Sequence, residues 1–162
     1  MPIYMKYDGV DGDITAKGYE KWIGLESCQL GANRNVTSPG GRGANREASA
    51  VRVSEISCSK TQDCSSMGLL KAALWGEGKK VNIHFVKTDK DKVETFLEIE
   101  LENTMVTSFS FSGHGGEGNS RPMEMFSLNF LKITVSTKQM GDKNQTGKPD
   151  RAMWNLAELK GA

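Results

Sequence analysis

Alternation of apolar and polar residues dominates the chain and predicts a fold made mainly of strands. Val81, Ile83 and Phe85 fall on one side of a short segment, with Asn82 and His84 on the other. A period of two is the pattern of a strand with one buried and one exposed face. We therefore expect a strand over these five residues.

The longest alternating run extends from Val93 into Phe111 and follows a charged turn. A second run, from Met123 to about Thr137, comes after a glycine-rich turn, so the two predict an antiparallel hairpin. In the second run the parity of the apolar positions changes near Phe130. Such a change predicts a bulge or a sharp bend, as at the corner of a small barrel.

One segment has helical spacing. Met67, Leu70 and Leu74 are spaced for one helix face, Asp63 precedes them as an N-cap, and Gly76 follows where a C-cap glycine belongs. Strands, one helix and then long strands predict a mainly β fold, either a small antiparallel β-barrel or two packed sheets, with one flanking helix.

The length of 162 residues predicts one domain over residues 1–162. The 37% hydrophobic content and the 18 glycines suit a soluble domain rich in turns. No stretch approaches the ~18 apolar residues of a membrane span, and four charged residues interrupt the first 13, so no signal-peptide core forms. We expect no membrane insertion, synthesis in the cytoplasm, and no cleavable signal peptide.

Charge disfavours a nucleic-acid partner, because 21 basic residues face 20 acidic ones. The best basic patch is a loop over residues 33–49 that carries Arg34, Arg42 and Arg46, with Arg52 after it. This loop lacks interleaved aromatic residues for base stacking, so a protein contact through guanidinium groups is favoured. An oligonucleotide-binding barrel ranks third among the functions considered.

Little in the sequence points to a cofactor, a metal or catalysis. Cys28, Cys58 and Cys64 show no C-x-x-C pair and are interpreted as reduced, half-buried thiols, while His84 and His114 are too few for most metal sites. Residues 113–118 match G-x-G-x-x-G but lead into a strand instead of a helix, which argues against a dinucleotide site.

A row of glutamates occupies the polar face of the long alternating run. Because strand residues two apart share a face, Glu94, Glu98 and Glu100 form a charged surface with Glu102. A solvated or interface-facing strand is favoured over general acid/base catalysis. The alternative function is a small β-barrel ligand-binding protein or hydrolase that uses the Gly113–Gly118 loop, with His114, Glu117 and Arg121.

Taken in order, several segments resemble the hemolysin-coregulated protein (Hcp) family, the inner-tube subunit of bacterial type VI secretion systems. These segments span essentially the whole chain. They are Ile3 to Tyr7, GVDGD at 9–13, GYEKWI at 18–23, the glycine-rich loop, VSEISCSK at 53–60, FLEIELENTMVTS at 96–108, MEMFSLNFLKI at 123–133, and Trp154.

The resemblance implies a barrel similar to phage tail-tube proteins and a non-enzymatic, structural role. It implies homohexameric rings that stack into an exported tube, with sheath, spike and baseplate partners and small effectors as possible cargo. The family's stacking loop corresponds to residues 33–49, which makes Arg34, Arg42 and Arg46 candidate contacts. Glu94, Glu98 and Glu100 become candidates for the lumen or an interface, and no fused toxin domain is expected.

Overall fold

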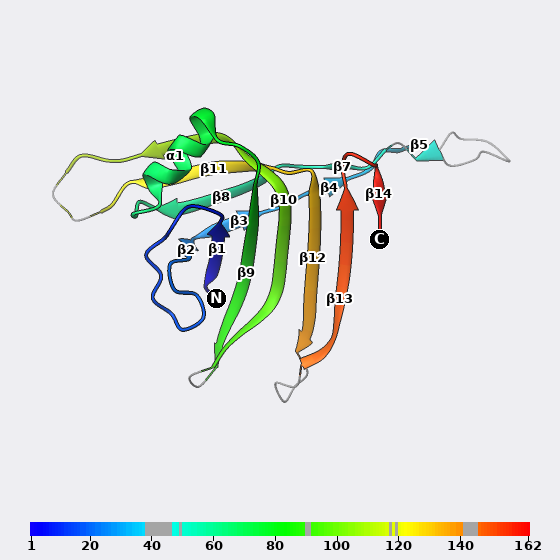
Figure 1. Cartoon of the computed structure of the whole chain (residues 1–162), viewed down its shortest axis with the longest axis horizontal. Coiled ribbons are helices and arrows are strands. Elements are labelled where there is room, and N and C mark those ends of the chain that lie inside the picture. The colour runs from blue at the N-terminus through cyan, green and yellow to red at the C-terminus, as the bar shows by residue number, and fades with distance from the viewer. Residues whose placement is uncertain (38–46, 49, 90–91, 117, 119, 141–145) are drawn as a thin grey trace.

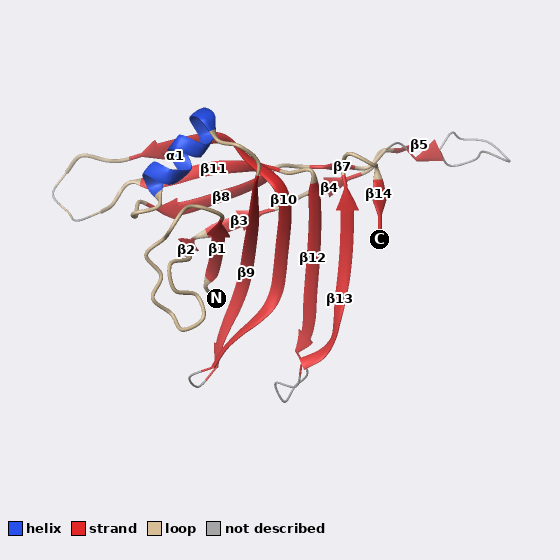
Figure 2. Ribbon diagram, viewed as in Figure 1, coloured by secondary structure: helices blue, strands red, loops and turns tan. Residues whose placement is uncertain are grey.

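In the computed structural model the described residues are 1–37, 47–48, 50–89, 92–116, 118, 120–140 and 146–162. They form short and long strands with one helix between them (Figure 2). The elements are β1 (Ile3–Tyr7), β2 (Ile23–Leu25), β3 (Ser27–Gln29), β4 (Ala32–Asn33), β5 (Val36–Thr37), β6 (Glu47–Ala48), β7 (Arg52–Val53), β8 (Ile56–Thr61), α1 (Ser66–Trp75), β9 (Lys79–Asp89), β10 (Lys92–Ser112), β11 (Met123–Asn129), β12 (Lys132–Met140), β13 (Thr146–Asn155) and β14 (Lys160–Gly161).

Two sheets pack against each other, and β10 belongs to both (Figure 1). The first sheet has the strand order β2-β1-β9-β10-β12-β13-β14, and the second has β10-β11-β8-β3, with antiparallel pairing throughout. The predicted mainly β fold of two packed sheets with one flanking helix is confirmed.

The long strand β10 turns from one sheet into the other at Asn103. This residue has a positive φ of 50°, and the register against β9 shifts between Leu101 and Thr104. Gly78 lies against the corner, where an added Cβ would meet Asn103 Oδ1 at 1.6 Å. Because glycine has no side chain, position 78 leaves room for the Asn103 side chain at this corner.

A second crossing lies at Glu26, between β2 in the first sheet and β3 in the second. The Glu26 backbone N–H donates to the Ser59 carbonyl at 2.8 Å as the chain passes between them. Strand pairing is interrupted here, so over the described residues the sheets do not close into a continuous barrel. The bend predicted near Phe130 is confirmed, because β11 ends at Asn129 in the second sheet and β12 begins at Lys132 in the first.

The core fills the space between the sheets, and α1 contributes Leu69 to it. The predicted helix face is wrong: Met67 is 59% and Leu74 64% exposed, whereas Leu69 is fully buried. At Gly68 the helix lies close to the Val10 side chain, which an added Cβ would meet at 2.7 Å.

The predicted caps of α1 also need correction. Ser65 is the N-cap, and Asp63 instead accepts hydrogen bonds from the Ser65 backbone N–H and hydroxyl. Gly76 does end the helix, but its φ of −69° is extended and not left-handed.

Candidate assembly surfaces

The described residues between β3 and β8, which are 30–37, 47–48 and 50–55, leave the second sheet, and we call them the arm. Within it β4 pairs with β7 and β5 with β6, so part of the expected loop is a narrow hairpin. At its base the Gly31 N–H donates to Ser54 Oγ at 2.8 Å, and the Ser54 N–H donates to the Gly31 carbonyl at 2.7 Å. Figure 1 shows β5 far out from the two sheets.

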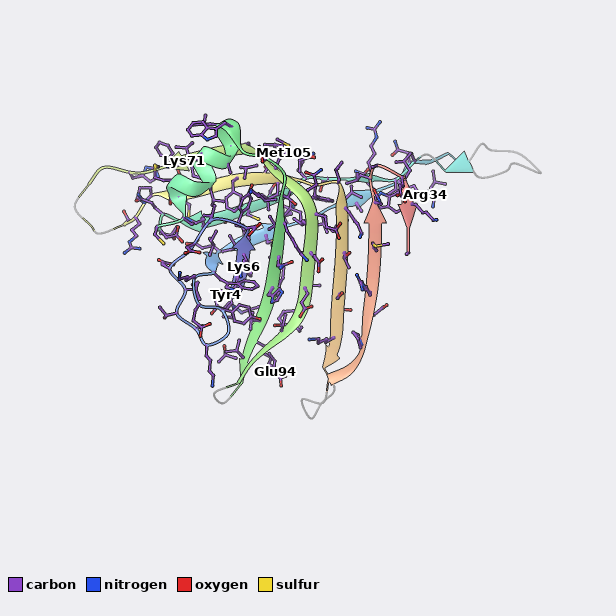
Figure 3. All side chains as sticks on the ribbon, viewed as in Figure 1. Tyr4, Lys6, Arg34, Lys71, Glu94 and Met105 are labelled. Carbon is purple, nitrogen blue, oxygen red and sulfur yellow. The ribbon has the colours of Figure 1, made fainter. Side chains whose placement is uncertain are left out.

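Only one of the three predicted stacking arginines falls on described residues. Arg34 is exposed and lies between β4 and β5, where the arm leaves the body (Figure 3). Arg42 and Arg46 lie outside the described residues.

The base of the arm packs beside the first sheet across an apolar cavity of about 270 Å³. Arm residues line one side of the cavity and residues of β12 and β13 line the other, so the base of the arm lies against the first sheet. The lining residues are Leu30, Ala32, Val51, Val53, Ile133, Val135, Ala152, Met153 and Trp154.

The predicted acidic face of β10 is charge-balanced in the structure. A lysine from an adjacent segment pairs with each of three glutamates, and we call these six residues the charged strip. The pairs are Lys138–Glu98 at 3.6 Å, Lys80–Glu100 at 2.9 Å and Lys132–Glu102 at 3.0 Å. The hydrogen bond to Glu100 is the main reason that the pKa of Lys80 is raised.

Glu94 lies apart from these ion pairs, toward the end of the β9–β10 hairpin (Figure 3). It is half-buried, and its backbone partner in β9 is Lys87. The structure thus places Glu98 and Glu100 on one face of β10 and pairs each with a lysine that the alternation does not reveal. The predicted continuation of that face to Glu94 is wrong, because the register against β9 shifts between Thr95 and Leu97: Glu94 lies opposite Lys87, on the other face from Glu98, which lies opposite His84.

A polar pocket of about 250 Å³ opens beside the charged strip. Glu98 and Glu100 supply its carboxylates, and Arg151 of β13 supplies a guanidinium group. The full lining is Asn82, His84, Glu98, Ile99, Glu100, Thr134, Ser136 and Arg151.

His84 joins this pocket to an aromatic cluster. Its Nδ1 is hydrogen-bonded to the Tyr19 hydroxyl at 3.1 Å, and that hydroxyl also contacts Thr95 Oγ1 at 2.5 Å. The Trp22 ring packs on His84 with centroids 4.8 Å apart. Burial is the main cause of the lowered pKa of His84, which favours the neutral imidazole.

Among the described residues, His114 and Arg121 of the alternative function share neither a hydrogen bond nor a pocket. His114 is exposed and makes no hydrogen bond with any described residue, and Glu117 lies outside those residues. Arg121 is exposed beside a different pocket, lined in part by Asp13, Glu26 and Asp63.

The described part of the chain contains no group of three or more His, Cys, Asp or Glu residues arranged to hold a metal ion. Its single helix is too short and too polar to cross a membrane.

A family model described as "Type VI secretion system effector, Hcp" matches residues 4–136. The chain belongs to the Hcp family. A search of curated protein sequences gave no significant match. Family membership confirms the predicted resemblance and makes this a type VI secretion tube or effector protein.

Solved structures of Hcp proteins share this fold over nearly the whole chain. A structure described as a type six secretion system protein is 26% identical with a TM-score of 0.89, and the match covers 99% of both chains. Hcp1 from Salmonella typhimurium is 18% identical with a TM-score of 0.79, over 99% of this chain and 98% of its own. Hcp3 from Pseudomonas aeruginosa is 19% identical with a TM-score of 0.58, over 92% and 96%.

Proposed function

We propose that this Hcp protein is a structural subunit of the type VI secretion inner tube, which assembles as homohexameric rings that stack and are exported. The observation that carries the proposal is the family match over residues 4–136 together with the shared fold across 99% of a type six secretion system protein. Identical copies of a chain close into a ring when one surface of each copy binds a different surface of the next copy.

The arm supports a role in stacking. Its β5 lies far out from the two sheets, so this part of the arm can reach a copy in an adjacent ring (Figure 1). Arg34 is exposed just before β5, and Arg42 and Arg46 follow in the sequence. Guanidinium groups suit such contacts because each presents several donors in a fixed plane.

The outer face of the first sheet has the properties expected of a surface that lines a lumen. Its ion pairs are solvent-exposed, with side-chain exposures of 56% for Lys80 and 42% for Glu100. Lys and Glu are depleted from the cores of protein interfaces, which favours a water-filled lumen over a subunit contact for this face. Glu98 and Glu100 are then wall residues, whereas Glu94 lies on the other face of the sheet, and small effectors are the cargo that the wall would meet.

The role is not enzymatic. The sheath, spike and baseplate proteins of the secretion system are the expected partners beyond the tube itself. Synthesis in the cytoplasm is followed by export through the contractile machine, without a cleavable signal peptide. The hydrolase alternative lacks support at the glycine loop, where His114 has no hydrogen-bond partner among the described residues.

Native mass spectrometry and light scattering, with electron micrographs of the same peak, test the assembly. We expect a hexamer with an open centre in the absence of any ligand. A compact monomer at every concentration would remove the ring from the proposal.

Stacking is tested separately, on rings already shown to form. Replacing Arg34, Arg42 and Arg46 together with alanine should shorten or abolish stacks in micrographs while the hexamer remains. Arg121→Ala, which removes an exposed arginine away from the arm, is the matched control and should leave stacking unchanged. Stacks of normal length from the triple variant would contradict the role of these arginines.

A further inference from the structure

Two cysteines that are distant in the sequence lie directly opposite each other. Cys28 of β3 is the register partner of Cys58 of β8 in an antiparallel pair. Opposed residues in such a pair have Cα atoms about 4.5 or 5.5 Å apart, and both separations lie within the range of about 4.4 to 6.8 Å that a disulfide spans. The backbone therefore already has the separation that a cross-strand disulfide requires.

The two thiols are also in contact with each other. A hydrogen bond between them lowers the pKa of Cys28, while the same bond and burial raise the pKa of Cys58. Cys28 is half-buried and Cys58 is buried. Cys28 is both the more exposed thiol and the one whose thiolate is more stable, so it is expected to react first.

We propose that Cys28 and Cys58 form a reversible dithiol–disulfide site that reacts with low-molecular-weight disulfides such as oxidised glutathione. The Cys28 thiolate attacks one sulfur of oxidised glutathione, which forms a mixed disulfide and releases one glutathione thiolate. The Cys58 thiol then loses its proton, attacks Cys28 Sγ and releases the second glutathione. In total two cysteine thiols are oxidised and one glutathione disulfide is reduced to two glutathione thiols.

The product would join β3 to β8 on the two sides of the arm, because residues 30–53 lie between the two cysteines. Closing that loop restricts the unfolded chain and ties the base of the arm covalently. A protein that leaves a reducing cytoplasm for an oxidising exterior would gain this bond after export. The reaction itself needs no ring and stands independently of the proposed assembly.

The experiment uses the full chain with Cys64→Ser, since Cys64 is exposed and would otherwise compete. The reduced, folded variant is incubated with oxidised glutathione at about pH 8 without oxygen, then analysed by intact mass and thiol titration. We expect both remaining thiols to disappear, the mass to fall by two hydrogens, and dithiothreitol to reverse the change. Urea unfolding should show a higher midpoint for the oxidised form.

Tryptic mapping of the wild-type chain identifies the partners. Cleavage after Lys or Arg places the three cysteines in three peptides, 22–34, 53–60 and 61–71. The expected cross-link joins 22–34 to 53–60. Light scattering on the same samples reports ring formation, so a failure of the disulfide is distinguishable from a failure of assembly.

Two variants in the Cys64→Ser background test the order of attack. Cys58→Ala should accumulate a stable mixed disulfide of one glutathione on Cys28, whereas Cys28→Ser should leave the buried Cys58 unmodified. The proposal is overturned if the folded Cys64→Ser protein keeps both thiols free, or stops at a mixed disulfide. A wild-type cross-link that involves peptide 61–71 would overturn it as well.

Discussion

Lys60 is fully buried between the second sheet and the start of α1. Its Nζ lies 2.7 Å from Asp63 Oδ1 and 2.7 Å from Glu124 Oε2, and it also donates to the Thr61 carbonyl at 3.1 Å. Glu124 is itself only 3% exposed. One cation thus neutralises two carboxylates that have lost most of their water, and it links β8, β11 and the segment that leads into α1.

Removing that cation should be costly. Lys60→Met leaves the Glu124 and Asp63 carboxylates without a counter-charge, so we expect a loss of about 3 to 5 kcal/mol in the free energy of unfolding. Urea denaturation near neutral pH measures it. The double variant Lys60→Met, Glu124→Leu should recover part of the loss, because it also removes the more deeply buried acid. A change below ~1 kcal/mol in the single variant would show that the ion pairs do not carry this junction.

His84 predicts a pH dependence of stability. Burial lowers its pKa in the folded chain below the ordinary value of about 6.5, so the unfolded chain binds the proton more readily. The contribution of His84 is fully present above that ordinary value and is lost as the pH falls toward the folded pKa. Unfolding midpoints measured from about pH 7 to pH 5 should therefore fall.

Two glutamine variants isolate the histidine responsible. His84→Gln should flatten part of the decline, whereas His114→Gln, on the exposed glycine loop, should follow the wild-type curve. Parallel curves for His84→Gln and the wild type would show that other groups produce the pH dependence.

Among the elements, α1 gives the sharpest contrast between pattern and packing. Positions 69 and 74 of this short helix are both leucine, but Leu69 is buried and Leu74 is 64% exposed. Leu69→Ala should lower the free energy of unfolding by about 2 to 5 kcal/mol through lost burial and a cavity. Leu74→Ala should stay within about 0.5 kcal/mol. Thermal or urea unfolding checks both, and equal losses would contradict the assigned face.

The strands of this chain were more predictable than its contacts. Alternation located the faces of β9 and of β10 from Leu97 to Glu102, and the parity change located the break at Phe130, because both depend on local burial. It missed the register shift between Thr95 and Leu97, which reverses the faces of the preceding residues. The corner at Asn103 and the pairing of Cys28 with Cys58 depend on register between distant segments, which alternation does not encode. The same limit hid Lys80, Lys132 and Lys138, which turn an apparently acidic row into ion pairs.

At the scale of the whole molecule, the first sheet carries the charged strip. The arm projects away from the two sheets (Figure 1). The three lysines and three glutamates of the charged strip balance one another within one chain. In a ring of copies around an axis, the strip would therefore contribute little net charge to the central channel. The arm connects β3 and β8 of the second sheet, and its base lies against β12 and β13 of the first. These features separate the surface assigned to the lumen from the one assigned to stacking.

Exchanging one ion pair tests the assignment of the strip. The double variant Lys80→Glu, Glu100→Lys can retain a pair like the one at 2.9 Å while reversing both charges. Because the pair is exposed, the exchange should change stability by at most about 1 kcal/mol. If the strip faces a water-filled lumen, the variant should form hexamers of wild-type mass in native mass spectrometry. Monomers with an unchanged unfolding midpoint would instead place the strip at the contact between subunits, since reversed charges disrupt a complementary interface without unfolding the chain.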